Sequence, residues 1–116
     1  MLSLPASTQV YLCVRPVDLR KSFDGLSAIV EVVFQRNLLD GHLFLFINRR
    51  RDRVKALWWE RDGLVIWYKR LERGCFELPR DALEQEHVTL DATALAMLLG
   101  GVPLATPRRV RYSRAS

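Results

Sequence analysis

Three strand-like runs separated by two turn signals occupy residues 42–71 and constrain the fold more than any other part of the chain. The runs read HLFLFI, VKALWWE and LVIWYKRL, and each is short, apolar and rich in β-branched or aromatic side chains. The last two runs flank Asp62-Gly63, a dipeptide typical of a two-residue hairpin turn. The pattern therefore predicts an antiparallel meander of three strands.

Shorter segments on both sides of the meander complete the predicted domain. The runs QVYLCV at 9–14 and CFEL at 75–78 predict two further strands. Apolar residues at steps of three and four predict a helix over 19–36, with Asp18 as its N-cap. A second helix is predicted after Asp91, through ATALAMLL.

Together these elements predict an α+β fold. We expect an antiparallel meander sheet of about four to five strands, with one long N-terminal helix and a short C-terminal helix packed on it. The predicted domain spans residues 1–105. The segment 106–116 is basic and lacks apolar periodicity, so we expect a flexible tail.

The predicted meander is apolar on both faces. With Asp62-Gly63 as the turn, Trp58 lies opposite Trp67 and Trp59 opposite Ile66, so the two adjacent tryptophans point to opposite faces. The N-terminal helix can cover only one face. The other face requires the C-terminal helix, a second copy of the protein or a different partner.

Charge is strongly segregated along the chain, whose net charge is +5. Residues 49–75 hold nine basic and four acidic side chains, whereas 76–105 hold one arginine and five acids. Four more arginines lie in 106–116. This distribution suits a polyanionic partner, although the tail could also neutralise the acidic segment.

The basic side chains of the middle segment are the predicted nucleic-acid contacts. In the register above, the loop NRRRDR and the turn after the last strand gather at one end of the sheet, where phosphate contacts would be salt-sensitive and independent of sequence. The alternative is that the loop is charged only for solubility. The candidates are Arg49, Arg50, Arg51, Arg53, Lys55, Lys69, Arg70 and Arg73.

Aromatic residues on one face of the meander are candidates for stacking on bases or for contact with a partner, because single-strand platforms combine aromatic and basic side chains. These are Trp59, Tyr68 and Phe46. Secondary basic candidates are Arg20, Lys21, Arg108 and Arg109.

The sequence offers little for catalysis, metal binding or membrane insertion. The acids are scattered, the two histidines have no neighbours at ligand spacing, and no nucleophile motif occurs, so we expect no enzyme, metal or cofactor. No apolar run approaches the roughly 20 residues of a membrane span. Cys13 and Cys75 are far apart, and no secretory signal is evident, so we expect a cytoplasmic protein with reduced thiols.

Residues 10–80 resemble TnpB, the small accessory protein encoded by the second open reading frame of the IS66 insertion-sequence family. The resemblance rests on VYLCVRPVDLRKSFDGL, on HLFLFINRRRDRVKALWWERDGLVIWYKRLERGCFELP and on the spacing between them. It implies a bacterial protein that acts in transposition with a separate transposase and a small partner protein, without catalytic activity of its own. The chain departs from the family pattern at Arg15, Val17 and Arg51, and a glycine is common at the third of these positions.

The residue patterns and the resemblance together predict a non-catalytic accessory protein for DNA transposition that binds DNA through its basic loop. The alternative is an adaptor that docks the transposase or another element-encoded partner through an apolar sheet face. A cryptic nuclease is a third hypothesis. A homo-oligomer is compatible with every one of these.

Overall fold

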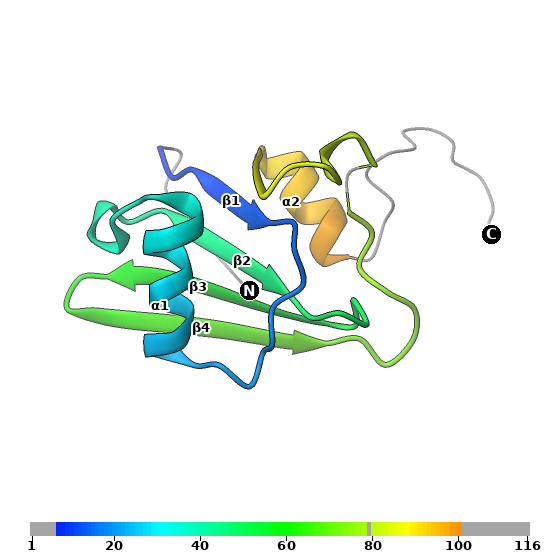
Figure 1. The fold of residues 1–116 in the computed structure, drawn as a ribbon, viewed down its shortest axis with the longest axis horizontal. Coiled ribbons are helices and arrows are strands. Elements are labelled where there is room, and N and C mark those ends of the chain that lie inside the picture. The colour runs from blue at the N-terminus through cyan, green and yellow to red at the C-terminus, as the bar shows by residue number, and fades with distance from the viewer. Residues whose placement is uncertain (1–6, 79, 101–116) are drawn as a thin grey trace.

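A five-stranded sheet with a helix on each face forms the protein in the computed structural model, which describes residues 7–78 and 80–100 (Figure 1). The strand order is β4-β3-β2-β1-β5. The strands are β1 (Val10–Cys13), β2 (Leu43–Ile47), β3 (Arg53–Glu60), β4 (Gly63–Arg70) and β5 (His87–Leu90). The main helices are α1 (Phe23–Ile29) and α2 (Ala92–Leu99), and short helical turns lie at η1 (Val30–Phe34), η2 (Leu38–Asp40) and η3 (Arg80–Ala82). The predicted α+β class is confirmed.

The meander of β2, β3 and β4 is confirmed, with a shift in its second turn. Arg61-Asp62 forms the turn, so Trp58 lies opposite Val65 and not opposite Trp67. This displaces the predicted pairing by two residues. Because side chains alternate between faces with a period of two, such a shift leaves every predicted face assignment unchanged.

The prediction of a wholly antiparallel sheet is wrong. β1 pairs with β2 in parallel, with Tyr11 opposite Phe44 and Leu12 opposite Leu45. The connection between the two strands carries α1 over one face of the sheet, and such crossovers join parallel strands. The chain therefore contains a strand–helix–strand unit before the meander.

The last strand also differs from the prediction. Residues 75–78 form no strand, yet Phe76 and Leu78 are buried in the core. The outer strand is instead β5, which pairs antiparallel with β1. Val88 and Leu90 alternate with His87 and Thr89, but this four-residue alternation was too short to stand out in a polar stretch.

The long N-terminal helix predicted over 19–36 is also wrong. The helix begins at Phe23 and changes at Val30 into a five-residue π-helical turn that ends at Phe34. Asp18 does not cap the helix, because its carboxylate binds Arg20. The wider π turn brings Phe34 into the core directly after Val30, which leaves Val33 only partly buried. By contrast, α2 begins as predicted, where Asp91 accepts a hydrogen bond of 2.7 Å from the amide of Ala94.

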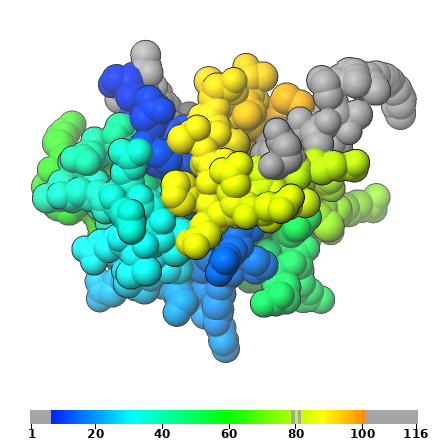
Figure 2. All heavy atoms as spheres, turned by 45° about the horizontal axis from the view of Figure 1, so that its top comes forward, coloured from blue at the N-terminus to red at the C-terminus, as the bar shows by residue number. Residues whose placement is uncertain are grey.

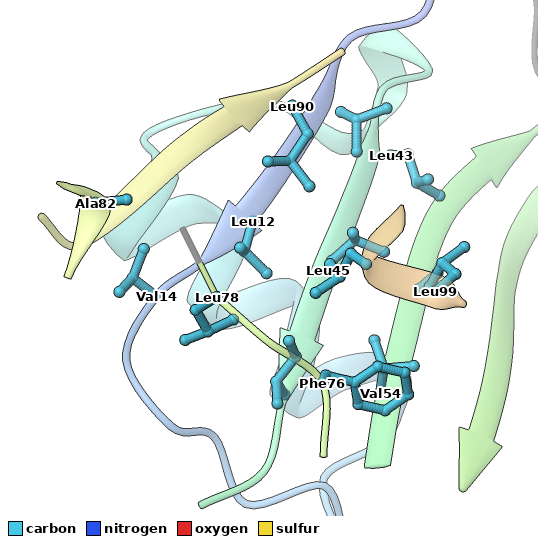
Figure 3. Packing of buried hydrophobic residues seen from close by; sticks show 14 residues of the cluster. Leu12, Val14, Leu43, Leu45, Val54, Phe76, Leu78, Ala82, Leu90 and Leu99 are labelled. Atoms are coloured by element: carbon cyan, nitrogen blue, oxygen red, sulfur yellow. The ribbon is translucent and has the colours of Figure 1, made fainter. Parts of the chain in front are cut away.

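Two hydrophobic clusters, one on each face, hold the sheet between the helices. On one face α1 and η1 bury Leu26, Val30 and Phe34 against Phe44, Phe46 and Leu57. On the other face α2, residues 76–78 and the η3 turn cover the strands, and Figure 3 shows Phe76 and Leu99 beside Leu45 and Val54. Both faces of β1, β2 and the first half of β3 are thus covered by this chain. Of the three predicted covers for the second face, the C-terminal helix is the one that the structure shows.

Within the described residues, no helix is long and apolar enough to cross a membrane. The predicted tail 106–116, with Arg108 and Arg109, lies outside those residues. The boundary at residue 105 stays a prediction.

Candidate nucleic-acid interface

Asn48 organises the basic loop between β2 and β3. Its side-chain oxygen accepts hydrogen bonds from the amides of Asp52 and Arg53, at 3.1 and 3.0 Å. Its side-chain nitrogen donates to the Asp52 carboxylate at 2.7 Å, and this hydrogen bond is the main reason that the pKa of Asp52 lies below its ordinary value. These hydrogen bonds fix the conformation of the loop, and Asp52 contributes to them through both its carboxylate and its amide.

Arg51 has the backbone conformation that the resemblance associated with glycine. Its φ angle is +60°, in the left-handed region. The chain therefore keeps the tight bend at this position and adds a cationic side chain to it. The Arg51 amide donates to the Asn48 carbonyl at 3.0 Å, which closes the turn.

The turn after β4 is joined to this loop at two points. The amide of Leu71 donates to the carbonyl of Asp52 at 2.8 Å, and the amide of Phe76 donates to the carbonyl of Arg51 at 2.6 Å. Arg73 projects from the chain between these two attachments and is exposed. The prediction that loop and turn gather at one end of the sheet is confirmed.

A third segment, residues 16–20, joins the loop from the connection between β1 and α1. The amide of Val17 donates to the carbonyl of Ile47 at 2.9 Å, which holds this segment beside the loop. The two segments and the end of β4 enclose an open cleft of about 430 Å³, and in Figure 2 the blue atoms of 16–20 lie beside the green atoms of the loop. Its lining consists of residues 16–20, Asn48, Arg49, Arg50, Arg53 and Tyr68. Sequence reasoning missed Pro16, Val17 and Leu19, and nothing local in the chain marks them as neighbours of the loop.

Asp18 and Arg20, which both line this cleft, form an ion pair. The guanidinium donates to both carboxylate oxygens, at 2.7 to 3.1 Å, and the Arg20 amide donates to one of them at 3.0 Å. These hydrogen bonds lower the pKa of Asp18 to about 2. Because the charge of Arg20 is paired with Asp18, Arg20 is a weaker candidate for a phosphate contact.

Tyr68 stands between two basic side chains of β3. Its hydroxyl accepts a hydrogen bond from the Arg53 guanidinium at 2.9 Å, and this contact raises the pKa of Arg53. The Lys55 ammonium lies 4.9 Å from the centre of the Tyr68 ring. The ring thus has a fixed position while 48% of the residue remains exposed.

Besides Arg53, three more of the predicted phosphate contacts have partners within the protein. Lys55 is buried, and its ammonium donates to the Lys21 carbonyl at 2.8 Å. Lys69 donates to the carbonyl of Leu99 at 3.0 Å, where the negative end of the α2 dipole favours a cation. Arg70 pairs with Glu72 at 3.2 Å. Lys69 and Arg70 also lie on opposite faces of β4, so they do not act together.

Four arginines remain available at this end of the sheet. Arg49, Arg50, Arg51 and Arg73 are all exposed. None of them forms an ion pair or a side-chain hydrogen bond with the described part of the chain. We call these four residues the arginine edge.

The aromatic candidates have three different environments. Phe46 is fully buried under α1, so it cannot stack on a base in this fold. Trp59 is half-buried near the opposite end of β3, away from the basic loop. Tyr68 alone of the three lines the cleft beside the arginine edge.

The family model described as IS66 Orf2 like protein matches residues 8–109. The chain belongs to this family. The uncharacterized protein y4hO of Sinorhizobium fredii is 31% identical to it over 93% of this chain and 92% of that protein. The uncharacterized protein y4jC of the same organism is 29% identical over 68% of each chain. No solved structure matches the chain.

Membership of the IS66 Orf2-like family indicates an accessory protein of an insertion sequence. At the loop end of this IS66 Orf2-like protein, free guanidinium groups stand on a fixed backbone, an arrangement whose chemistry suits an anion. In residues 7–78 and 80–100, no three His, Cys, Asp or Glu side chains come together as metal ligands would. The matched region contains the whole arginine edge and the cleft.

Proposed function

We propose that this protein is a non-catalytic accessory protein of transposition that binds DNA through the arginine edge. The observation that carries the proposal is the separation of the basic residues at this end of the sheet into two groups. Arg20, Lys55, Lys69 and Arg70 have partners within the protein, whereas the four arginines of the edge have none among the described residues. Charge left without partners at one place on a surface attracts a polyanion.

The fixed backbone under the arginine edge supports the same proposal. The Asn48 side chain and the two backbone hydrogen bonds to the following turn hold the loop before any ligand arrives. A preformed site loses less conformational entropy on binding than a mobile loop does. The two acids adjacent to the edge in sequence have other partners, because Asp52 accepts a hydrogen bond from Asn48 and Glu72 pairs with Arg70.

The test is the affinity of the full chain for duplex DNA from the element ends, measured by fluorescence anisotropy at several salt concentrations. The double variant Arg49→Gln/Arg50→Gln should bind more weakly. The slope of log K against log salt should fall by about 1 to 2, since each lost phosphate contact removes about 0.9 from it. Each single variant should remove about half of this change.

Arg61→Gln is the matched control, because Arg61 is an exposed arginine in the turn at the opposite end of β3 and β4. It should leave both the affinity and the slope close to those of the wild type. Salt-independent binding, or an equal loss in Arg61→Gln and Arg49→Gln, would contradict the assignment to the arginine edge.

A second candidate function is docking of an element-encoded protein at β4. In the described residues no strand pairs with the outer side of β4, which is eight residues long and carries half-buried apolar side chains. Such edges accept an added strand from a partner. The proposal predicts that the element's transposase co-purifies with the wild type at high salt and is lost with Val65→Lys. Val32→Lys, at an exposed position of η1, is the control that should retain it.

A further inference from the structure

We propose that the cleft beside the arginine edge holds one unpaired nucleotide of a DNA strand, with its base stacked on Tyr68 and its phosphate bound by Arg49 and Arg50. This inference rests on the proposed DNA binding and adds the form of DNA that the site selects. Single-stranded ends, or duplexes with an extruded base, are therefore the preferred ligands.

The cleft has the size and the lining that a nucleotide requires. Its volume of about 430 Å³ lies within the usual range of small-ligand sites, which is roughly 300 to 1,000 Å³. Pro16, Val17 and Leu19 supply an apolar side, while Arg49 and Arg50 supply positive charge. A nucleotide has the matching division between a flat base and a charged phosphate.

The Tyr68 ring is prepared for stacking. Arg53 holds its hydroxyl at 2.9 Å, and the Lys55 ammonium lies over the ring at 4.9 Å from its centre. A cation occupies only one face of a ring, and almost half of the residue is exposed. Since Tyr68 belongs to a strand and not to a loop, a base that stacks on it meets a surface already in place.

The acceptor groups around the cleft have little capacity left to read the edge of a base. The Asp18 carboxylate accepts four hydrogen bonds from Arg20, and the Asn48 oxygen accepts two from backbone amides. The donors that remain belong to flexible arginine side chains, which contact any phosphate. Binding should thus depend on stacking and on phosphate contacts, both of which tolerate any base.

A paired base cannot reach this position. Within a duplex both faces of each base are covered by its neighbours, and a protein side chain stacks on it only after the base leaves the helix. The arginine edge can contact the phosphates of a duplex, but the cleft adds affinity only for an unpaired nucleotide. Duplex binding therefore tests the arginine edge, and preference for an unpaired nucleotide tests the cleft.

The experiment compares three fluorescein-labelled DNA probes with the full chain at one salt concentration. They are an oligothymidylate of about 12 nucleotides, a fully paired duplex of equal length, and that duplex with one unpaired central thymine. The wild type should bind the first and third more tightly than the second. Tyr68→Ala should weaken binding of the first and third by roughly 5- to 100-fold and leave the paired duplex unchanged.

Two further variants keep the result interpretable. Phe23→Ala removes an aromatic residue that is 44% exposed and does not line the cleft, so it should change no affinity. Tyr68→Phe keeps the ring and should retain the preference for unpaired DNA. Loss of the preference in Tyr68→Phe would assign it to the hydroxyl and Arg53, and would overturn the stacking arrangement.

Equal binding of the three probes, unaffected by Tyr68→Ala, would overturn the nucleotide site and leave duplex binding by the arginine edge intact. Failure of all three probes to bind would overturn both proposals. An oligouridylate of equal length serves as a fourth probe. Tighter binding of that RNA than of the oligothymidylate would overturn the assignment to DNA.

Discussion

The hydroxyl of Tyr68 on β4 accepts a hydrogen bond of 2.9 Å from the guanidinium of Arg53 on the neighbouring strand β3. Two residues further along β3, Lys55 lies directly opposite Tyr68 and directs its ammonium toward the same ring. Two cations thus fix one aromatic side chain at the surface, next to the arginine edge. Tyr68 should therefore matter more for ligand binding than for the stability of the domain.

Tyr68 and Phe46 should differ sharply in their contribution to stability. Phe46→Ala should lower the free energy of unfolding by about 3 to 5 kcal/mol, because it leaves a cavity beneath α1. Tyr68→Ala should lower it by about 1 kcal/mol or less, since the side chain is half exposed. Urea unfolding followed by circular dichroism measures both values. Similar losses in the two variants would contradict the burial described for Phe46.

Asn48→Ala should loosen the basic loop. The substitution removes the acceptor for the amides of Asp52 and Arg53, and we expect a loss of about 1 to 3 kcal/mol in unfolding free energy. Hydrogen exchange of these two amides should speed up more than that of strand β2. Unchanged exchange at both amides would show that the Asn48 side chain does not hold the loop.

Arg51→Gly should be more stable than Arg51→Ala by about 0.5 to 1 kcal/mol. Both variants remove the cation, but only glycine adopts a φ of +60° without steric cost, and its greater freedom in the unfolded chain offsets part of that gain. Thermal unfolding of the two variants side by side gives the difference. A more stable alanine variant would exclude the left-handed conformation at this position.

Arg20→Gln should raise the pKa of Asp18 from about 2 toward its ordinary value of 3.8. In the wild type the folded pKa is depressed, so the ion pair stabilises the fold above about pH 3.8, and this contribution is lost as the pH falls through 2. A carbon-13 NMR titration of the Asp18 carboxyl group follows the shift. The Asp52 carboxyl group is the internal control, because Asn48 and not Arg20 lowers its pKa.

Several features of the site followed from the sequence alone, because they depend on local pattern. Alternation of apolar residues placed Leu45 and Ala56 on one face and Phe46 on the other, and this assignment survived a two-residue error in the hairpin turn. The turn prediction was wrong because Asp62-Gly63 is typical of the two central residues of a hairpin turn, whereas here Gly63 is the first residue of β4 and pairs with Glu60. The order of strands along the meander nevertheless brought loop and turn to the same end of the sheet.

The state of each basic side chain could not be read from its position in the chain. Lys55 and Arg53 are two residues apart in one strand, yet the first is buried on the Lys21 carbonyl and the second holds Tyr68 at the surface. Lys21 lies in a segment that reaches β3 only through the folded connection. Whether a cation is free for a ligand depends on such long-range neighbours.

The sequence by itself determined the family, the meander, the two apolar faces and the clustering of charge, because each is encoded by residues close together in the chain. Only the tertiary structure decided the parallel pairing of β1 with β2, the π-helical end of α1 and the arrival of residues 16–20 beside the loop. The strand pairing and the position of residues 16–20 depend on contacts between segments that are distant in the chain, and the π-helical end packs Phe34 on Phe44 and Phe46. In each case the packing of side chains against the sheet outweighs local propensity. The cleft exists only because that packing brings two distant connections to one end of the sheet.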